Sequence, residues 1–453
     1  MEGFTCFFRP IYIPIDLEII KSILVKDFGH FVNHGVYVNE QVDPLTGNLF
    51  NLEDGKWKNL RTKLTPAFTS GKLKMMFQTM LACSAGLENI LDEYSTTGHA
   101  VDIKEILSRF TIDVIGSCAF GIDCDSLKNP ESEFKTFTMK VFNRSLFTTV
   151  RQFVILLIPR HVLVKLRFKL TRRDIESFFI NTVRETVEYR EKHQIFRKDF
   201  MHLLLQGAVS DDEKFLAKDE EAKKDGRLSL NEIAAQCFVF FLAGFETSAT
   251  TVTFALLELA LNEDVQEKLR AEIQDVLEKH GEITYEAVME MSYLDKVINE
   301  NIPPFPGTPR VCTKTYRVPG TSVVIEPGTR VHIPIFGIQT DPEYYPEPDV
   351  FDPERFNEEN KAKRPAFAYI PFGEGPRICI GARFGLTQSK VGLVTILRRF
   401  RVTLNEKTKT PIEHGTKTFV LEVKGGVWLN ITKSIMYIFD ISFQDYSLKK
   451  LNI

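Results

Sequence analysis

The feature that most constrains this chain is a ten-residue loop near its C-terminal end, Phe372-Gly-Glu-Gly-Pro-Arg-Ile-Cys-Ile-Gly381. The loop brackets Cys379 with glycines, Gly375 and Gly381 among them, which permit backbone conformations and close approaches that a Cβ would block. A flat, bulky group could therefore lie almost against the main chain. The next segment, 382–400, has the apolar spacing of an amphipathic helix. This places Cys379 near a helix N-terminus, where the positive end of the macrodipole favours a thiolate over a thiol.

A thiolate held in this way is the axial ligand that pushes electron density onto haem iron and favours O–O cleavage. Arg377 would then pair with a haem propionate. For a lone cysteine a buried structural role is far more common, because free Cys is among the most buried residue types. Here the full pattern fixes Phe372, Gly375, Arg377, Cys379 and Gly381 together. It favours a haem-thiolate site, because five specified positions rarely coincide by chance.

Composition is that of an ordinary globular protein with a large core. The chain has 453 residues, of which 43% are hydrophobic and 26% charged. A net charge of −3 gives no support for nucleic-acid binding. Since no Ser/Gly-rich or Pro-rich linker divides the sequence, we expect one large domain. The 7 cysteines are scattered without a Cys-x-x-Cys pair, which favours a reducing compartment over a disulfide framework.

Apolar periodicity predicts a mostly helical body between residue 60 and about residue 299. The helical spacing is clearest in the segments 75–91, 103–118, 175–189 and 265–277. The most apolar stretch, 233–261, is long enough to span a bilayer but polar at its centre, so we expect a buried central helix. The preceding Ser229-Leu-Asn-Glu232 has the form of a capping box.

After residue 300 the pattern changes to short apolar runs separated by Pro-Gly turns. The runs 311–318, 322–325 and 330–335 predict small antiparallel hairpins. Residues 341–356 carry 4 prolines, too many for regular structure, and the charged run 211–227 is expected to be a solvated loop. The predicted fold class is α+β, mostly α, with a large helical body and a small β-rich portion.

The motif Ala243-Gly-Phe-Glu-Thr247 lies in the middle of the long apolar helix and is unfavourable there in three ways. Gly244 costs about 1 kcal/mol relative to alanine. Glu246 and Thr247 place polar groups where the core is expected, and a mid-helix threonine can bond back to the i−4 carbonyl. We interpret the motif as catalytic: Gly244 would open a groove for O₂, and Thr247 and Glu246 would supply protons. A kinked core helix with satisfied polar groups is the alternative, and the motif alone does not decide between them.

Trp57 and Arg61 are four residues apart and so share one helix face. The indole N–H and the guanidinium could both reach one carboxylate, such as a haem propionate. A surface cation–π contact is the commoner explanation for such a pair. His30 and His34 have the same spacing, but no third metal ligand is near and packing explains them better.

Taken together, these residues resemble the cytochrome P-450 superfamily, most closely the microsomal insect enzymes that oxidise xenobiotics, over roughly residues 3–428. The resemblance also includes Asp43-Pro-Leu-Thr-Gly-Asn-Leu-Phe50, Thr65-Pro-Ala-Phe-Thr-Ser-Gly71 and Pro353-Glu-Arg-Phe356. It implies the cytochrome P-450 fold and haem b (iron protoporphyrin IX), with Cys379 as the iron ligand. The further haem contacts that it implies are Trp57, Arg61, Arg310, Phe372, Gly375, Arg377 and Gly381.

The resemblance implies a monooxygenase that inserts one oxygen atom from O₂ into an apolar organic substrate, either a xenobiotic or an endogenous lipid-like compound. Electrons would come from an NADPH-dependent flavin reductase. The family's microsomal members lie on the cytosolic face of the endoplasmic reticulum membrane, so peripheral attachment there is expected. Basic residues that flank the motifs expected on the proximal face are predicted to steer the acidic reductase, although a merely solvated basic face explains them equally well. These residues are Lys56, Lys58, Lys63 and Arg383.

One departure from the family pattern favours an alternative function. Where the family has Glu-x-x-Arg, Glu300 is followed by Asn301-Ile-Pro-Pro304, so that Pro303 stands in place of the arginine. Proline ends a helix, and losing a buried ionic partner typically costs about 3–5 kcal/mol. Glu300 is still expected to pair with Arg355. The alternative is a catalytically impaired relic that binds haem or an apolar ligand without turnover.

Two further departures lie at the ends of the chain. It begins near the family's first strands, without the membrane anchor and hinge, and residues 434–453 extend beyond a single expected domain of residues 1–433. A nucleotide-binding protein built around Gly373 and Gly375 is a third, weaker reading. It fails because no Gly-x-Gly-x-x-Gly spacing or preceding βαβ unit is present.

Overall fold

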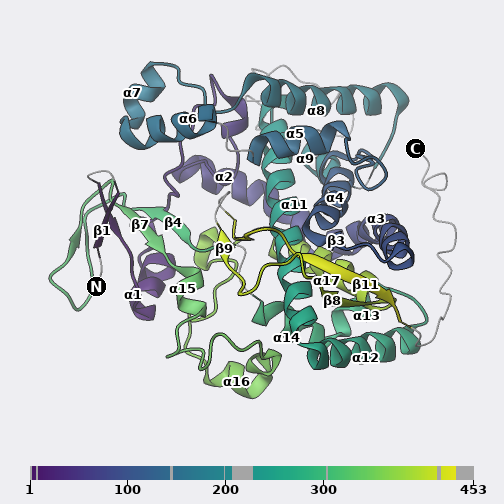
Figure 1. Cartoon of the computed structure of the whole chain (residues 1–453). Helices are drawn as coiled ribbons and strands as arrows, with labels where there is room; N and C mark the ends of the chain where they lie inside the picture. Colours follow the sequence, from purple (N-terminus) through teal and green to yellow (C-terminus); the bar gives the residue numbers. More distant parts are fainter. Residues whose placement is uncertain are drawn as a thin grey trace.

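A computed structural model describes most of the chain as a helical body with small sheets. The described residues are 3–6, 9–142, 146–197, 199–206, 228–301, 305–415 and 420–434. Helix α11 (Leu230–Leu261) runs through the middle of the body, and the four-stranded sheet lies to one side near the N-terminus (Figure 1). The predicted α+β, mostly α class is confirmed. Pro303, the loop 211–227 and the tail from residue 435 lie outside the described residues.

The other helices differ widely in length, and several of them pack against α11. The remaining α-helices are α1 (Leu17–Lys21), α2 (Asp54–Leu64), α3 (Ser70–Thr97), α4 (Ile103–Ile115), α5 (Glu133–Phe142), α6 (Leu146–Leu157), α7 (Arg160–Lys165), α8 (Arg173–His193), α9 (Phe200–Gln206), α12 (Glu263–His280), α13 (Tyr285–Glu290), α14 (Ser292–Glu300), α15 (Ile335–Gln339), α16 (Glu358–Lys363) and α17 (Ala382–Leu397). Short 3₁₀ or π segments are η1 (Ser22–Lys26), η2 (Phe28–His30), η3 (Pro44–Thr46), η4 (Thr65–Phe68), η5 (Gly116–Phe120), η6 (Pro353–Phe356) and η7 (Gly375–Arg377).

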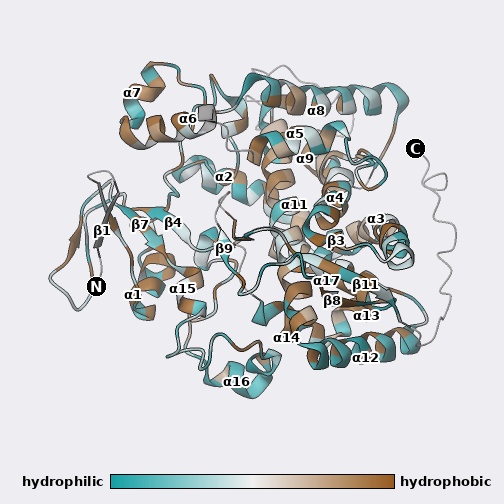
Figure 2. Ribbon diagram, viewed as in Figure 1, coloured by the Kyte–Doolittle hydropathy of each residue, from teal (hydrophilic) through white to brown (hydrophobic). Residues whose placement is uncertain are grey.

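The four helical segments expected from periodicity are confirmed as α3, α4 with η5, α8 and α12. The capping box is formed as predicted: Ser229 Oγ accepts from the Glu232 amide, and Glu232 Oε2 accepts from the Ser229 amide. Burial along most of α11 identifies it as a core helix, although its length and apolarity alone would suffice to cross a membrane. In Figure 2 the peripheral helix α12 is largely hydrophilic, as expected for a helix with one face in solvent.

The strands form four small sheets. They are β1 (Gly3–Cys6), β2 (Arg9–Tyr12), β3 (Val101–Asp102), β4 (Thr308–Val311), β5 (Tyr316–Arg317), β6 (Val324–Ile325), β7 (Arg330–Ile333), β8 (Phe400–Leu404), β9 (His414–Gly415), β10 (Glu422–Val423) and β11 (Trp428–Lys433). The sheet orders are β1-β2-β7-β4, β3-β11-β8, β10-β9 and β5-β6. In the described chain β2–β7 is the one parallel pair.

The hairpin prediction is partly wrong. The apolar run 311–318 divides into β4 and β5, because only β5 pairs with β6 as a local hairpin. β4 pairs with β7 instead, and β7 adds the N-terminal strand β2 on its other side. Non-local pairing of this kind leaves no turn signal in the sequence. The proline-rich stretch 341–356 contains only the 3₁₀ segment η6, as its composition suggested.

Two non-local contacts bring the site together. The amide of Val311, at the end of β4, donates to the Asn33 carbonyl at 2.9 Å, so the segment 31–34 lies beside β4. Helix α17, which directly follows the cysteine loop, packs against α11 and α3. The loop is thereby held between the central helix and the N-terminal segment.

Candidate functional site

The cysteine loop is a tight structure that needs glycine at specific positions. The Cys379 amide donates to the Phe372 carbonyl at 3.0 Å and closes the loop. Gly373 and Gly375 have φ values of 72° and 74°, a region that favours glycine. A Cβ on Gly375 would lie 2.0 Å from the Leu24 carbonyl oxygen, so no larger residue fits there.

Gly381 is different, because its φ is −92° and the nearest atom to an added Cβ is Phe68 Cε1 at 4.0 Å. The backbone requirement expected for Gly375 is therefore confirmed. The protein backbone itself does not require glycine at Gly381, and its expected role in close approach of a cofactor stays a prediction. Gly381 caps α17, so Cys379 lies near a helix N-terminus as predicted.

Cys379 is exposed to solvent, although nearby protein atoms desolvate its thiol. The space in front of this thiol is called the cysteine recess below. The other free cysteines in the described chain are buried or half-buried. Desolvation raises the pKa of Cys379, against the opposing effects of the Gly381 amide and the Arg61 charge. The Gly381 amide at the start of α17 thus favours the thiolate as predicted, but in the unligated protein desolvation outweighs it. A coordinated metal reverses this balance, because a metal-bound thiol is deprotonated outright.

Helix α2 presents Trp57 and Arg61 to the cysteine loop. Arg61 Nη1 donates to the Ile378 carbonyl at 2.9 Å, next to Cys379. Trp57 is buried, and the Arg377 guanidinium stacks 4.0 Å from its ring centroid. The predicted helix face is confirmed, but each of its two residues contacts a different part of the loop.

Arg310 and Arg377 are two buried guanidinium groups. Arg377 donates to the carbonyls of Val32, Leu49 and Leu52 at 2.9, 3.2 and 2.7 Å. Arg310, only 1% exposed, donates to the Thr308 hydroxyl and the Pro309 carbonyl, and its Nε has no partner within the described residues. Desolvation and the charge of Arg310 lower the pKa of Arg377 to about 9, and desolvation lowers that of Arg310 to about 10.

His34 belongs to the same cluster, although the sequence suggested only packing for it. Its Nδ1 donates to the Phe50 carbonyl at 2.8 Å, and its ring stacks on Phe50. Desolvation, followed by the charges of Arg310 and Arg377, lowers the pKa of His34 to about 3. The sequence contains no signal for this contact, because the Asn33–Val311 bridge that brings His34 close to Arg310 joins segments far apart in the chain.

This cluster provides a test of whether the chain fits haem. Both arginines are buried, and in the described chain neither has a carboxylate within hydrogen-bonding or ion-pairing distance. Buried charge is costly unless it is paired, so the cluster lacks an anionic partner. The two carboxylates of haem b would supply that partner, beside a thiol of the type that ligates haem iron. The residues fit the group.

Helix α11 passes close to the cysteine loop at residues 240–248. Phe68 lies against Gly381 and also packs against Phe240, with ring centroids 5.1 Å apart. On the other side, Gly385 of α17 approaches Ser248, whose Oγ is 3.8 Å from a Cβ built on the glycine. Within this stretch Ala243 is exposed, although the helix on either side is largely buried. The motif 243–247 therefore lies beside the cysteine recess.

Thr247 of this motif bonds back along the helix as expected, and Thr251, one turn later, does the same. Thr247 Oγ1 donates to the Ala243 carbonyl at 2.6 Å, and Thr251 Oγ1 donates to the Thr247 carbonyl at 3.0 Å. Gly244 does not open a groove at its missing side chain, because a Cβ there would lie 2.7 Å from Ile115 Cδ1. The structure accounts for Gly244 by close packing of α11 against α4.

Glu246 forms an ion pair with Lys104 of α4, at 3.0 Å between Oε1 and Nζ. Lys104 also donates to Thr250 Oγ1 at 2.5 Å. Desolvation lowers the pKa of Lys104, while Glu246 opposes the shift. Sequence reasoning missed Lys104, because nothing in its neighbourhood marks it as the partner of a glutamate 142 residues away.

The expected Glu300–Arg355 pair is confirmed. Arg355 Nε donates to Glu300 Oε1 at 3.0 Å, and the Asp352 amide donates to the same oxygen at 3.1 Å. Arg355 also donates to the carbonyls of Pro346, Glu347 and Val350. Desolvation raises the pKa of Glu300 to about 7 in spite of Arg355.

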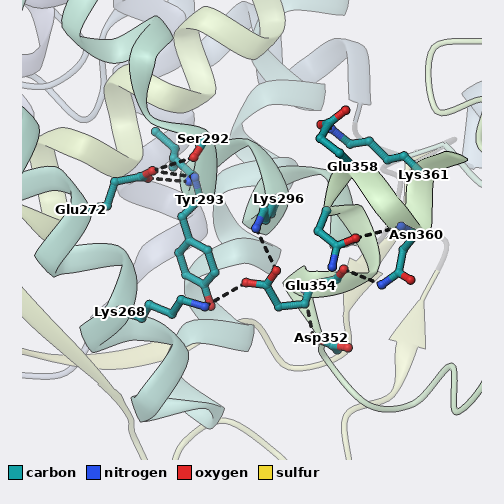
Figure 3. Close-up of polar contacts among 12 residues, drawn as sticks. Lys268, Glu272, Ser292, Tyr293, Lys296, Asp352, Glu354, Glu358, Asn360 and Lys361 are labelled. Carbon is teal, nitrogen blue, oxygen red and sulfur yellow. Dashed lines mark hydrogen bonds and ion pairs between the residues drawn. The ribbon is translucent and has the colours of Figure 1, made fainter.

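A second network, at the surface, joins α12 and α14 to η6. Glu354 accepts from Lys268 and Lys296, each at 2.8 Å, and Glu272 accepts from Ser292 and from the Tyr293 amide (Figure 3). Glu272 thus holds the start of α14 against α12, and Glu354 ties η6 to both α12 and the middle of α14. These contacts therefore fix the position of the Glu300–Arg355 pair.

Comparison with known proteins agrees with this geometry. Residues 4–429 match the family Cytochrome P450. The chain is 43% identical to Probable cytochrome P450 6a13 of Drosophila melanogaster, over 94% of this chain and 84% of the relative. It is 40% identical to Cytochrome P450 6A1 of Musca domestica, over 95% of this chain and 84% of the relative. The family matches nearly the whole chain, and the cysteine recess lies beside a cluster of buried arginines that lacks an anion. The chain belongs to the cytochrome P450 family and is an oxidoreductase of the monooxygenase type.

Proposed function

We propose that this chain oxidises an apolar organic substrate at a haem b ligated by Cys379, with electrons from an NADPH-dependent flavin reductase. The observation that carries the proposal is the solvent-reachable Cys379 thiol beside two buried arginines that lack a carboxylate. When bound, haem supplies activation of O₂ and insertion of one oxygen atom. The residues proposed to hold it are Cys379, Phe372, Gly375, Gly381, Trp57, Arg61, Arg310, Arg377 and, from the structure, His34.

The chain's own residues have separable tasks in this proposal. Arg310 and Arg377 would bind the two carboxylates of the cofactor, and Trp57 keeps the Arg377 guanidinium in place by stacking. Arg61 fixes the loop through the Ile378 carbonyl. Ala243 and the half-buried Phe240 give α11 an apolar surface beside the recess, which suits an apolar substrate.

Proton supply would use Thr247, with its hydroxyl next to the exposed Ala243. Glu246 is a positioning residue here, since its carboxylate is paired with Lys104. Gly244 contributes by allowing α11 to approach Ile115 closely. Replacing Thr247 by valine keeps the volume and removes the hydroxyl, so we expect oxygen consumption to continue while product formation falls.

The test of the proposal is the spectrum of the reduced, carbon monoxide-bound protein after addition of haem. A strongly red-shifted Soret band of the thiolate type is expected from the unaltered chain. Cys379→Ala should lose this band, whereas the matched control Cys83→Ala should retain it. Absence of haem uptake by the unaltered chain would overturn the proposal and favour the alternative, a catalytically impaired relic of such an enzyme.

The reductase surface is proposed from exposed basic residues around α2 and the start of α17. Lys56 pairs with Glu40, and Arg383 Nη1 donates to Ser70 Oγ at 3.1 Å, while Lys58 and Lys63 are exposed. Charge reversal at Lys58 and Lys63 should reduce reductase-supported turnover most at low salt. The control is reversal of Lys279 on α12, and an unchanged salt dependence in the double variant would refute this surface.

Location is proposed from the relatives: peripheral attachment to the cytosolic face of the endoplasmic reticulum membrane. Fractionation of cells that express the chain tests it. Recovery in the microsomal pellet, with release by high salt or alkaline carbonate, is expected of a peripherally attached protein. Recovery in the soluble fraction would refute attachment without affecting the proposed chemistry.

A further inference from the structure

We propose that Lys104 is a positioning residue for the oxidation, because it holds the turn of α11 that carries Thr247. The inference rests on the proposed function, in which Thr247 supplies protons. Lys104 belongs to α4, the helix that packs against α11 at Gly244. The contacts of its Nζ atom with α11 carry the inference.

The Lys104 ammonium reaches three oxygen atoms within one turn of α11. Its Nζ atom lies 3.0 Å from Glu246 Oε1, 3.4 Å from the Glu246 carbonyl oxygen and 2.5 Å from Thr250 Oγ1. Glu246 directly precedes Thr247, and Thr250 follows it by three residues. Lys104 therefore binds α11 on both sides of Thr247 along the chain, as a clamp supplied by another helix.

The clamped turn is a weak part of α11. Thr247 Oγ1 donates to the Ala243 carbonyl, and Thr251 Oγ1 donates to the Thr247 carbonyl. Hydroxyls that bond back to the i−4 carbonyl slightly destabilise a helix and often bend it. Gly244 adds backbone freedom in the same stretch. The clamp by Lys104 offsets this freedom and gives the Thr247 hydroxyl one defined direction.

The clamp depends on the positive charge of Lys104. The exposed fractions of the Lys104 and Glu246 side chains are 27% and 14%, so solvent screens this pair less than a pair at the surface. Desolvation lowers the pKa of Lys104, while the charges of Glu246, of Glu422 on β10 and of Asp102 on β3 oppose the shift. Lys104 therefore loses its proton, and with it the ion pair, at a lower pH than an exposed lysine.

The alternative is an ion pair that only stabilises the packing of α4 against α11. Either role predicts a lower Tm when Lys104 is replaced. The two roles differ in product formation, because only a positioning role makes the yield of product depend on the charge at residue 104.

The main experiment measures product formed per O₂ consumed by the haem-loaded protein. The probe substrate is the alkoxycoumarin that the unaltered chain dealkylates fastest, with electrons from the reductase. Lys104→Met removes the charge at similar volume and should lower this ratio about five- to tenfold, the worth of one hydrogen bond. The thiolate-type carbon monoxide band should be retained. A ratio equal to that of the unaltered chain would overturn the proposal.

The pH profile separates the positioning role from a merely structural one. In the unaltered chain the ratio should fall as pH rises through the lowered pKa of Lys104. Lys104→Arg keeps a cation whose pKa lies above about 12, so its ratio should persist at a pH where the unaltered chain has lost it. Identical alkaline limbs in the two proteins would refute the positioning role.

Lys135→Met is the matched control. Lys135 Nζ also pairs with a glutamate, Glu105 of α4, at 2.6 Å, and its side chain is 17% exposed. This pair joins α5 to α4 and does not involve α11. Its loss should lower Tm but leave the ratio and its pH profile unchanged. A fall as large as that in Lys104→Met would count against the clamp.

A measurement on the haem-free protein tests the clamp without any turnover. Competitive acetylation of amines, read by peptide mass spectrometry at a series of pH values, reports the pKa of Lys104. Glu246→Gln removes the carboxylate that opposes desolvation, so this pKa should fall by about 1–3 units. The labelling of Lys135 should not change. An unchanged Lys104 profile would overturn the inference.

Failure of haem uptake would leave the labelling result as it is. A failure of this inference and a failure of the proposed oxidation are therefore distinguishable.

Discussion

Two buried polar regions of this molecule have opposite imbalances. Around Arg310 and Arg377, donors and positive charge exceed what the described chain offers as partners, and one donor remains unpaired. Around Glu300, a carboxylate is desolvated, and the oxygens of Asn301 and Gln339 have no partner within the described residues. The first region holds its neighbour His34 in the neutral form, while the second raises the pKa of its own carboxylate.

The comparison shows that the sign of an uncompensated buried charge indicates the charge of the group that is missing beside it. A native chain rarely retains buried polar groups without partners, because each costs about 1–3 kcal/mol. A region with surplus donors points to an anionic group, and one with a desolvated carboxylate points to a cationic one. The following predictions test this opposition.

The largest effect is expected from Arg310→Met. In the haem-loaded protein the change removes a buried partner of an anion, so haem affinity should fall by about 2–5 kcal/mol. In the haem-free protein the sign should reverse, because the substitution relieves desolvation and an unpaired donor. Haem titration and urea unfolding measure the two effects. Arg401→Met, at a half-exposed arginine paired with Glu267, is the control and should change neither by much.

Glu300→Gln should change the pH dependence of stability. The pKa of Glu300 is raised to about 7 from 4.5, so its contribution to stability is present below about pH 4.5 and is lost as pH rises through 7. The unaltered chain should lose on the order of 2–3 kcal/mol over this range from this group, and Glu300→Gln should not. Urea unfolding at a series of pH values measures the difference.

Glu354→Gln is the matched control for this experiment. The pKa of Glu354 is lowered by Lys268 and Lys296, so its contribution is present above pH 4.5 and is lost as pH falls. Glu300→Gln and Glu354→Gln should therefore change the pH dependence of stability in opposite directions. Parallel changes would contradict the assignment of opposite environments.

A smaller effect is expected at His34. With one of its two neighbouring charges removed in Arg310→Met, the pKa of His34 should rise from about 3, by roughly one unit. Ring chemical shifts followed against pH report the change directly. Arg401→Met should leave the pKa of His34 unchanged. If Arg310→Met also left it unchanged, His34 would not sense the charge of Arg310.

The smallest effect is expected from Lys268→Met in the surface network. Lys268 is 57% exposed and shares Glu354 with Lys296, so its loss should cost less than about 1 kcal/mol. Thermal unfolding at low and at high salt measures it. A loss of stability as large as that expected for the buried groups would contradict the distinction between buried and exposed networks.

The sequence predicted those parts of the fold that depend on neighbours in the chain. The capping box at Ser229, the amphipathic helices and the glycine requirement at Gly375 all follow from local patterns. The parallel pairing of β2 with β7 and the contact of Asn33 with Val311 do not, because they join segments far apart in sequence.

The same division applies to the candidate site. The sequence identified Cys379 and Arg377, which lie in one loop, but not Lys104 as the partner of Glu246 or His34 as a neighbour of Arg310. It also assigned Gly244 to a groove, whereas the Ile115 side chain of another helix occupies the space where a Cβ would lie. Partners that arrive from a distant element need the three-dimensional arrangement.

The threonine hydrogen bonds of α11 have a mechanical consequence. Asn301 binds the Thr251 carbonyl, Thr251 binds the Thr247 carbonyl, and Thr247 binds the Ala243 carbonyl. These three consecutive hydrogen bonds connect Asn301, at the end of α14, with the exposed Ala243 of α11. The segment after Glu300 is therefore anchored to the same helix that carries the proposed catalytic motif.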